Sequence, residues 1–245
     1  MFPYISLTTI YFLTIKQILL TVRTGLTDSI CPGEWYEVID EIKKCTKCKL
    51  HKTRRNPVPG EGPCNAKIMF VGEAPGGKED ETGRPFVGAA GQFLTELLGM
   101  AGLRREDVFI TNILKCRPPN NRDPEPDEIE ACKPYLVRQI RLISPKVIVT
   151  LGRYAGRTLL GDAGVKWTSM SRMHGKIFSV ELYGVKLKIM PTYHPAAALY
   201  YPKLRPVIVR DFKEVLKALV EELASEGKRG ESGRPRTILD FLGKS

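Results

Sequence analysis

The stretch Lys67-Ile-Met-Phe-Val-Gly72, followed at once by Glu73-Ala-Pro-Gly-Gly77, decides the fold class of this chain. Its first half is a short, continuous apolar run that ends in glycine, which is typical of a strand buried on both faces. Similar runs occupy residues 108–112, 147–152 and 187–190, and amphipathic stretches separate them. Strands that alternate with helices predict βαβ crossovers. We therefore expect an α/β fold, a three-layer αβα sandwich around a mostly parallel four-stranded sheet.

The amphipathic stretches predict helices over residues 92–100, 127–142, 153–160 and 207–224. The last of these carries one apolar face, made by Val209, Phe212, Val215, Leu216, Leu219 and Val220. Pro126 followed by two acidic residues is a typical helix start, since negative charge favours the positive end of the helix dipole. A further helix over residues 35–45 is expected to pack outside the sheet and to deliver the first cysteines.

Four of the six cysteines have the spacing of a metal or cluster site: Cys45, Cys48, Cys116 and Cys132. A Cys-x-x-Cys pair places two thiolates on one centre, and thiolates select zinc or iron–sulfur clusters. A compact zinc ribbon brings two such pairs together within a short stretch, whereas here the other two cysteines arrive singly and far downstream. The pattern therefore favours a [4Fe–4S] cluster over zinc.

The remaining cysteines, Cys31 and Cys64, have no partner at ligand spacing, so ordinary buried thiols describe them better. Disulfides are the weaker alternative, because intracellular thiols stay reduced outside hyperthermophiles. Few glutamines and 18 prolines point in the direction of a thermophilic source.

The charge of the chain suggests a polyanionic partner. Its 245 residues carry a formal charge of +11 and the sequence pI is about 9.4. Such an excess of Lys and Arg favours nucleic acid, because neutralising phosphates releases condensed counterions. The length is enough for one well-buried core with extensions.

Both ends of the chain differ in composition from the middle. Residues 1–22 are apolar, but Lys16 and Gln17 interrupt them and no cleavage site is clear, so an extension from a non-native start explains residues 1–30 better than a membrane span or export signal. Residues 226–235 have the composition of a flexible linker. An apolar cluster follows, with Ile238, Phe241 and Leu242, and reads as a docking peptide. We divide the chain into 1–30, a domain over 31–224 and a tail over 225–245.

Function in open α/β sheets gathers at the carboxyl ends of the strands. That rule selects the loop over residues 72–80, then Asn112 at the end of the second strand, and His194 after the last. A carboxamide offers a donor and an acceptor to a planar heterocycle, and Phe86 offers a stacking platform. The plainer alternatives are a simple strand-to-helix turn, a hydrogen-bonded structural histidine and a core phenylalanine. The glycine-rich loop matches neither the Walker A nor the dinucleotide-binding pattern.

Together these motifs resemble the family 4 uracil-DNA glycosylases, the iron–sulfur branch of that superfamily. The resemblance rests on the motifs at residues 72–80, 83–88, 111–118 and 194–196, taken in order, and on the cysteine pattern, with Cys116 and Cys132 as the late ligands. It extends over residues 35–223. One departure is Ala196, where serine is common after His-Pro.

The resemblance implies a monofunctional enzyme of DNA base excision repair, cytoplasmic, prokaryotic and monomeric, without a membrane role. It flips deoxyuridine out of DNA and hydrolyses the N-glycosidic bond, which leaves an abasic site. Carried over by position, Glu73 and His194 are catalytic: Glu73 positions the water or assists its attack, and His194 stabilises charge on uracil O2. The implied uracil-binding residues are Gly72, Glu73, Ala74, Glu79, Phe86, Asn112 and His194.

Individual roles follow from the same resemblance. Phe86 would stack on the base, Asn112 would pair with its N3–H and O4, and Glu79 would obstruct a thymine methyl. Leu199 or Tyr200 would wedge into the DNA, or simply pack. Arg117, Arg122 and Lys133 are expected to contact phosphates. The tail, with Ile238, Phe241 and Leu242 as its plug, resembles a sliding-clamp-binding motif that lacks the usual leading glutamine.

Two other functions stay open on the sequence. A non-catalytic, metal-stabilised nucleic-acid-binding protein would share the basic composition, but it has no need of Glu73, Asn112 and His194 at three converging strand ends. A glycosylase of the same fold with a different deaminated base, such as hypoxanthine, is the closer alternative, because Asn112 favours uracil without excluding wider tolerance.

Overall fold

All of the strands predicted from the apolar runs lie in one sheet. The computed structural model describes residues 31–232, with side chains as far as Ser225. The strands are β1 (Ile68–Gly72), β2 (Phe109–Asn112), β3 (Val147–Leu151), β4 (Phe178–Leu182) and β5 (Val185–Thr192), in the spatial order β2-β1-β3-β5-β4. The first four strands in that order run parallel, and β4 pairs antiparallel with β5 at the edge.

The fold class is therefore confirmed, but the expected number of four strands is wrong. The missing strand, β4, alternates between half-buried and exposed residues until its buried last residue, Leu182. An edge strand of this kind has no continuous apolar run, so the criterion that found the buried parallel strands overlooks it.

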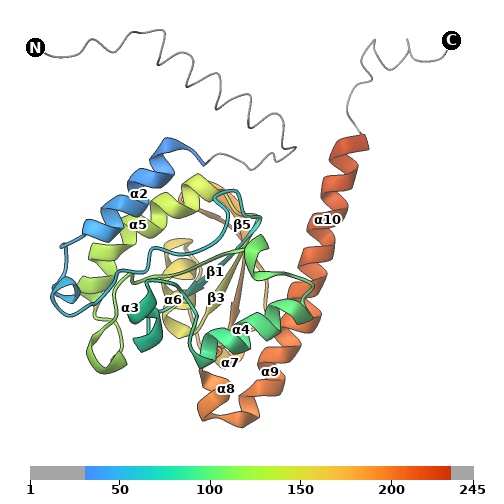
Figure 1. The fold of residues 1–245 in the computed structure, drawn as a ribbon. Helices are drawn as coiled ribbons and strands as arrows, with labels where there is room; N and C mark the ends of the chain where they lie inside the picture. Colours follow the sequence, from blue (N-terminus) through green and yellow to red (C-terminus); the bar gives the residue numbers. More distant parts are fainter. Residues whose placement is uncertain (1–30, 233–245) are drawn as a thin grey trace, which may run out of the picture. The chain divides into compact units, whose positions relative to one another are not determined.

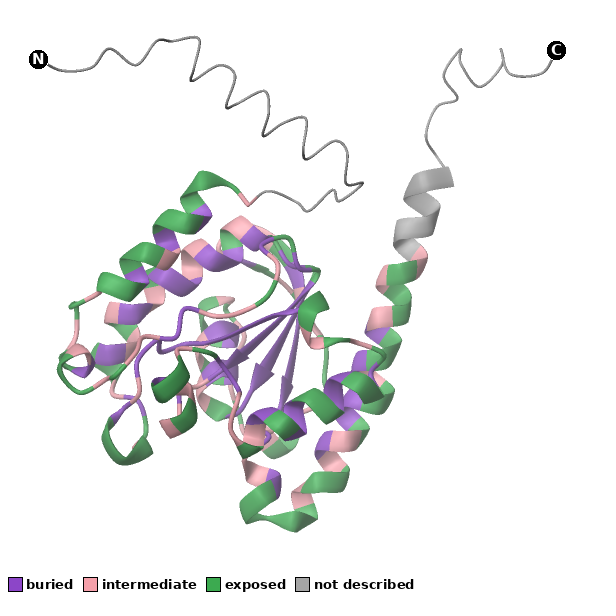
Figure 2. Cartoon of the chain, viewed as in Figure 1, coloured by how far each residue is buried: buried purple, intermediate pink, exposed green. Residues whose placement is uncertain are grey.

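Helices cover both faces of the sheet (Figure 1). On one face lie α4 (Ala89–Met100), α9 (Arg205–Arg210), a π-helical segment (Asp211–Leu216) and α10 (Lys217–Ser232). Phe70 of β1 stacks there on Phe212, with ring centroids 6.0 Å apart. On the other face lie α2 (Gly33–Lys44), α5 (Pro126–Ile143) and α6 (Arg153–Asp162). Figure 2 shows buried strands between helices that are buried on one side only.

Short elements complete the chain between these helices. They are α3 (Gly77–Thr82), α7 (Met170–Met173), α8 (Ala197–Tyr200) and the 3₁₀ turns η1 (Lys49–Lys52), η2 (Arg105–Asp107), η3 (Pro119–Asn121) and η4 (Pro202–Leu204). Within residues 31–232, no helix is long and apolar enough to cross a membrane.

The predicted terminal segments fall largely outside this description. The N-terminal extension over residues 1–30 and the clamp-binding residues Ile238, Phe241 and Leu242 lie outside the described residues. Helix α10 continues to Ser232, so it includes residues whose composition predicts a linker. Its first turn is buried in the core through Leu219, directly after the buried Leu216 of the preceding π-helical segment, and a packed start favours continuation of a helix.

Candidate active site

The carboxyl ends of β1, β2 and β5 meet around one cavity of about 320 Å³. Gly72 at the end of β1 pairs in register with Asn112 at the end of β2, and β5 ends at Thr192, two residues before His194. The cavity is lined by Glu73, Ala74, Pro75, Gly76, Glu79, Phe86, Ala90, Asn112, Pro118, Asn121, Arg122, His194, Ala196 and Tyr200. Six of the seven residues expected to bind uracil therefore face one space.

Gly72, the seventh, lies directly behind the cavity wall. A Cβ atom on Gly72 would lie 2.4 Å from Asn112 Oδ1 and 2.6 Å from Phe86 Cζ. Glycine is thus required here because it lets the backbone approach the two side chains that form the wall.

Asn112 is the least satisfied polar side chain of the cavity. The residue is only 1% exposed, and its Oδ1 atom is buried without a hydrogen-bond partner. An unpaired buried acceptor costs about 1–3 kcal/mol, and in native proteins a ligand, a water molecule or an ion commonly meets such a group. Asn112 is therefore shaped to accept a hydrogen bond from a molecule in the cavity.

His194 faces the same cavity as a neutral imidazole. Burial lowers its pKa to about 4, although the charge of Glu79 acts in the opposite direction. The backbone N–H of Ala196 donates to His194 Nδ1 over 3.2 Å. Because Nδ1 accepts, the single proton of the neutral ring is on Nε2, which is left free to donate. Since this bond comes from the backbone, alanine in place of serine at position 196 does not disturb it.

Phe86 forms an aromatic wall beside the histidine. Its ring lies against His194 with centroids 5.5 Å apart and planes 29° from parallel. The chain after it is held by Glu79, whose Oε1 accepts hydrogen bonds from the backbone N–H groups of Val87 (2.8 Å) and Gly88 (2.9 Å). Glu79 thus lines the cavity, but one of its carboxylate oxygens is committed to this loop.

Among the carboxyl groups that line the cavity, that of Glu73 has the pKa that is shifted most. Its pKa is raised to about 7, mainly by burial; the charge of Asp123 adds to the increase, and that of Arg153 opposes it. Asp123 and Arg153 also pair with each other, with Arg153 Nη2 2.6 Å from Asp123 Oδ2. A carboxyl group that titrates near neutral pH inside a cavity is typical of a group that handles protons or water.

Some lining residues were not assigned to the cavity from the sequence. Asn121 and Ala90 belong to no motif that predicted a pocket, Pro118 ends the motif over residues 111–118 without having been assigned to the cavity, and Arg122 and Tyr200 were expected on DNA instead. Asn121 and its neighbour Asn120 both have positive φ angles, of 53° and 54°, a turn that an Asn-Asn pair in a loop could have suggested.

The four predicted ligand cysteines also come together, around a second and smaller cavity. Cys45, Cys48, Cys116 and Cys132 all line it, and all four are free thiols. Cys31 and Cys64 do not line it; both are disulfide-bonded, so the expectation of ordinary thiols there is wrong. Across the described residues, no three His, Cys, Asp or Glu side chains have the arrangement of a single-ion site.

Donors already face three of the four sulfurs. Arg54 Nη1 lies 3.0 Å from Cys116 Sγ, and the backbone N–H groups of Lys115 and Lys47 lie 3.3 Å from Cys132 Sγ and 3.5 Å from Cys45 Sγ. Such N–H···S contacts surround iron–sulfur clusters and tune them. Four thiols in a site with these donors have the chemistry of a thiolate-ligated cluster.

Burial raises the pKa of three of the four thiols at this site. For Cys132 the pKa reaches about 12, mainly through loss of solvation, and the pKa of Cys116 and of Cys48 is raised for the same first reason. A bound metal deprotonates its thiol ligands outright. These thiols therefore need a cationic centre to become thiolates at neutral pH.

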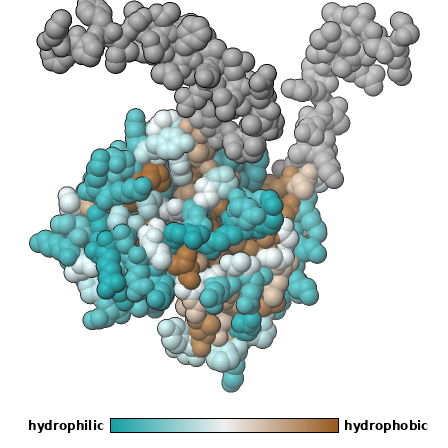
Figure 3. Space-filling model, in the orientation of Figure 1, coloured by the Kyte–Doolittle hydropathy of each residue, from teal (hydrophilic) through white to brown (hydrophobic). Residues whose placement is uncertain are grey.

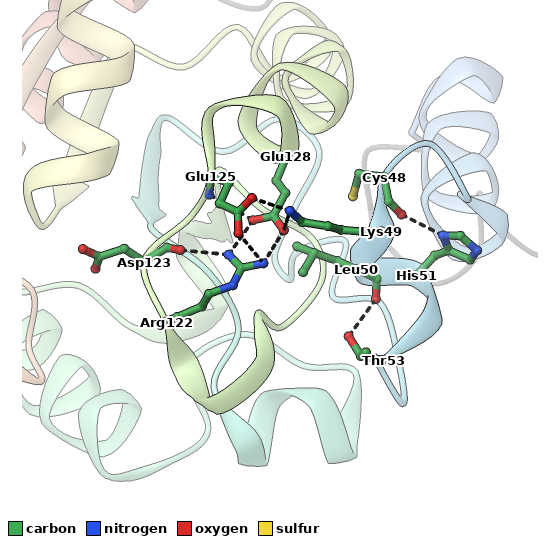
Figure 4. A network of polar contacts seen from close by, with 9 residues as sticks. All are labelled: Cys48, Lys49, Leu50, His51, Thr53, Arg122, Asp123, Glu125 and Glu128. Atoms are coloured by element: carbon green, nitrogen blue, oxygen red, sulfur yellow. Dashed lines mark hydrogen bonds and ion pairs between the residues drawn. The ribbon is translucent and has the colours of Figure 1, made fainter.

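A polar network connects the segment that contains Cys48 and Lys49 to Arg122 at the wall of the first cavity (Figure 4). Glu128 is fully buried, and Arg122 binds it through both terminal nitrogens, at 2.9 Å and 2.5 Å. Lys49, next to Cys48, pairs with Glu125 and lies 3.9 Å from Glu128. Arg122, expected to contact phosphate, is thus fixed to Glu128 at the cavity wall.

Lys115 lies between the two cavities and is completely buried. Its Nζ donates to Thr111 Oγ1 (2.6 Å), to the carbonyl of Asn112 (2.8 Å) and to Gln139 Oε1 (2.7 Å). Burial lowers its pKa to about 8. The amine therefore joins the strand that carries Asn112 to the helix that carries Cys132.

Comparison with known proteins identifies the family of this chain. A family model described as "Uracil DNA glycosylase superfamily" matches residues 59–223. The chain belongs to this superfamily.

Individual superfamily members agree with that assignment, and the predicted resemblance to the type-4 branch is confirmed. The chain is 52% identical over 204 residues to the type-4 uracil-DNA glycosylase of Saccharolobus solfataricus, which covers 80% of this chain and 94% of that protein. Identity to the type-4 enzyme of Archaeoglobus fulgidus is 55% over 179 residues, or 73% and 90% of the two chains. For Thermotoga maritima it is 45% over 192 residues, or 77% and 97%.

In this superfamily member, apolar side chains are exposed beside the cavity. Figure 3 shows a mainly hydrophilic face with patches of apolar residues. Leu199, Tyr200 and Tyr201 are three consecutive large hydrophobic residues, exposed by 47%, 78% and 65%. Among the described residues only Tyr36, Met100 and Ile177 share that character. Exposed aromatic and aliphatic groups in one segment mark an interaction surface.

Proposed function

We propose that this chain removes uracil from DNA by hydrolysing the N-glycosidic bond of a flipped deoxyuridine, leaving an abasic site. The observation that carries the proposal is the buried, unpartnered Oδ1 of Asn112 in a cavity that also holds the Phe86 ring and a neutral His194. Family membership over residues 59–223 supports it.

Base recognition in this proposal rests on hydrogen-bond polarity. Asn112 Oδ1 accepts from uracil N3–H, its Nδ2 donates to O4, and Phe86 stacks on the ring. Cytosine presents an acceptor at N3 and a donor at position 4, so it would leave buried polar groups unpaired, which is a heavy penalty. Glu79 narrows the space near C5, where thymine carries a methyl group.

Bond cleavage in this proposal separates a cation-like sugar from a uracil anion. The electron pair of the C1′–N1 bond goes to the uracil ring, and negative charge develops on O2. The Nε2–H of neutral His194 donates to O2, and a fixed donor aimed at developing charge is an efficient form of stabilisation. The Glu73 carboxylate orients the water that attacks C1′.

The same proposal includes no strand-cleaving lyase step. Such a step needs an amine that attacks C1′, and among the described cavity-lining residues none is a lysine. Lys115, nearby, is buried and has three acceptors of its own.

A [4Fe–4S] cluster held by Cys45, Cys48, Cys116 and Cys132 is the second part of the proposal. Its support is the set of four free thiols around one cavity with N–H groups aimed at their sulfurs. When bound, the cluster would supply a cationic cross-link between the end of α2, where Cys45 and Cys48 follow, the segment with Cys116, and helix α5 with Cys132. Its role is structural, because none of its ligands lines the cavity that holds Asn112.

DNA contacts are proposed for α8 and its surroundings. Leu199 or Tyr200 fills the gap left by the flipped base, as apolar wedges do, and the exposure of both side chains supports this. Lys133 is held by Asp162 at 2.7 Å and Arg122 by Glu128, so Arg117 is the better of the expected phosphate contacts, although its Nε donates to Asn121.

Clamp binding is proposed for the tail through Ile238, Phe241 and Leu242. Deleting residues 234–245 is expected to abolish binding to a sliding clamp while cleavage of short oligonucleotides stays unchanged. A truncated chain that binds the clamp as well as the full chain does would overturn this part.

One assay tests the main proposal. The protein is incubated with an oligonucleotide that contains a single uracil, and alkali then breaks any abasic site. We expect strand scission only after alkali. An iron-loaded, folded protein that yields no product would refute the proposal, and scission before alkali would refute the absence of a lyase step.

A further inference from the structure

Phe86 has a backbone conformation that is unusual for a bulky residue. Its φ angle is 51°, in the left-handed region, which phenylalanine rarely adopts. Strain of this kind persists only where the surrounding structure imposes it, and it gathers at functional sites. Phe86 is also a wall of the candidate active site, so the groups that impose the strain bear on function.

Two glycines make room for this conformation. A Cβ on Gly91 would lie 1.8 Å from the Phe86 carbonyl oxygen, and one on Gly72 would overlap the tip of the ring. Space alone does not hold a strained residue in place, however. That requires polar contacts on either side of it.

Arg105 binds the carbonyl groups of the strained segment. Its Nη1 donates to the Phe86 carbonyl over 3.1 Å, and its Nη2 donates to the Pro85 carbonyl. Glu79 binds the amide groups that follow Phe86, through the N–H groups of Val87 and Gly88. The strained segment is therefore held by the Arg105 cation, which binds its carbonyl groups, and by the Glu79 carboxylate, which binds its amide groups.

Arg105 is in turn fixed to the strand that carries the uracil-reading asparagine. Its side chain is 18% exposed, and its Nε lies 3.3 Å from Glu61 Oε1. The backbone of Glu61 exchanges two hydrogen bonds, of 2.9 Å and 2.8 Å, with Ile110 of β2. Asn112 follows two residues later. A continuous series of polar contacts thus connects Phe86, through Arg105 and Glu61, to the strand that carries Asn112.

We propose that Arg105 is a positioning residue for base recognition: it fixes the Phe86 ring relative to the Asn112 carboxamide, so that a planar pyrimidine fits between them. The inference rests on the proposed function and deepens it. Arg105 lies outside the residues that line the cavity, so it acts through Phe86 and not on the base. Its planar fork suits two carbonyl oxygens at once, which the single ammonium of lysine does not.

The neighbouring residue offers a matched control. Arg104 carries the same side chain one position earlier, but it is 71% exposed and binds Asp107 instead of the strained loop. Arg105→Met and Arg104→Met therefore remove the same charge and the same donors, and only one of them releases Phe86.

The test uses the iron-loaded full chain and two ligands, free uracil and DNA that contains an abasic site. For Arg105→Met we expect free-uracil binding to weaken about tenfold and kcat/KM on a uracil oligonucleotide to fall about ten- to a hundredfold, the scale of a small displacement at a reactive site. Affinity for abasic DNA should stay within about twofold, because that ligand lacks the base. Arg104→Met should match the wild type in all three.

Uracil binding that is unchanged in Arg105→Met would overturn the inference. So would a parallel loss of uracil and abasic-DNA binding with a lower melting temperature, because that is the pattern of a merely structural role. If Arg105→Met does not fold, Glu61→Gln decides: it keeps the backbone pairing with β2 but weakens the anchor of Arg105, and uracil binding must fall. Arg105→Lys should recover part of the loss.

The failure of this inference and that of the proposed function are distinguishable. A wild-type chain that releases no uracil refutes both. A wild-type chain that releases uracil beside an equally active Arg105→Met variant refutes only the positioning role.

Discussion

The acidity of Glu73 makes the pH dependence of the reaction a direct test of the proposed mechanism. Burial is the main reason for its pKa of about 7, and the nearby Asp123 adds to the effect while Arg153 opposes it. If the ionised carboxylate orients the attacking water, the single-turnover rate must follow the ionised fraction of this one group. His194, with a pKa of about 4, stays neutral over the same pH range, so its titration does not change the rate there.

The expected size of the effect follows from that pKa. A group with a pKa of about 7 is about one-tenth ionised at pH 6 and about nine-tenths ionised at pH 8, so the rate should rise about tenfold between them. Glu73→Gln should be slow and flat over this range. The assay is single-turnover excision from a U·G oligonucleotide at constant ionic strength, since DNA affinity depends strongly on salt.

Two substitutions should shift the rising part (the limb) of the pH–rate profile in opposite directions. Asp123→Asn removes a negative charge and releases Arg153 from its 2.6 Å ion pair, and both changes favour the carboxylate, so the limb shifts to lower pH. Arg153→Met removes the opposing positive charge and shifts it to higher pH. A flat wild-type profile, or a limb that ignores both substitutions, would refute the role of the Glu73 carboxylate.

The same pKa predicts that the stability of the fold decreases with rising pH, whereas the reaction rate increases. Because the folded-state pKa of about 7 lies above the ordinary value of 4.5, the folded state holds this proton more tightly, and stability falls as pH rises from about 4.5 to about 7. Glu73→Gln should therefore melt at a higher temperature than the wild type at pH 8, while the two should agree more closely at pH 4. Substitutions at active sites commonly increase stability while they reduce activity.

Two further substitutions test recognition and the cluster. Asn112→Asp should lower uracil excision by about a hundredfold or more, since it alters a buried hydrogen-bond pair, and oligonucleotides with uracil or cytosine measure the change in base choice. Any gain of cytosine cleavage supports the pairing role, and unchanged uracil excision contradicts it. Cys116→Ala should abolish the broad visible absorption and the bound iron and lower the melting temperature by several degrees. A colourless wild-type chain that contains zinc would contradict the choice of an iron–sulfur cluster.

The sequence alone determined the layers, the main elements, the four cysteines of one candidate site and most of the residues expected at the other. Parallel strands covered on both faces are largely apolar, so β1, β2, β3 and the buried part of β5 are visible as local runs. Glu73, Asn112 and His194 could be grouped because each follows a strand, and strand ends meet at one edge of a parallel sheet. The cysteines were recognisable from their spacing and from a family resemblance.

Tertiary structure alone decided the features that depend on atoms from distant segments. The edge strand β4 is half-exposed and lacks a distinctive run. The Nε2 proton of His194 depends on the backbone amide of Ala196, and the acidity of Glu73 depends on its burial and on Asp123. Arg105 looks like its neighbour Arg104 in sequence, yet only Arg105 reaches the strained carbonyls of Pro85 and Phe86. Apolar patterning is written locally along the chain, whereas hydrogen bonds and desolvation act over a few ångströms in space, between residues that only the fold brings together.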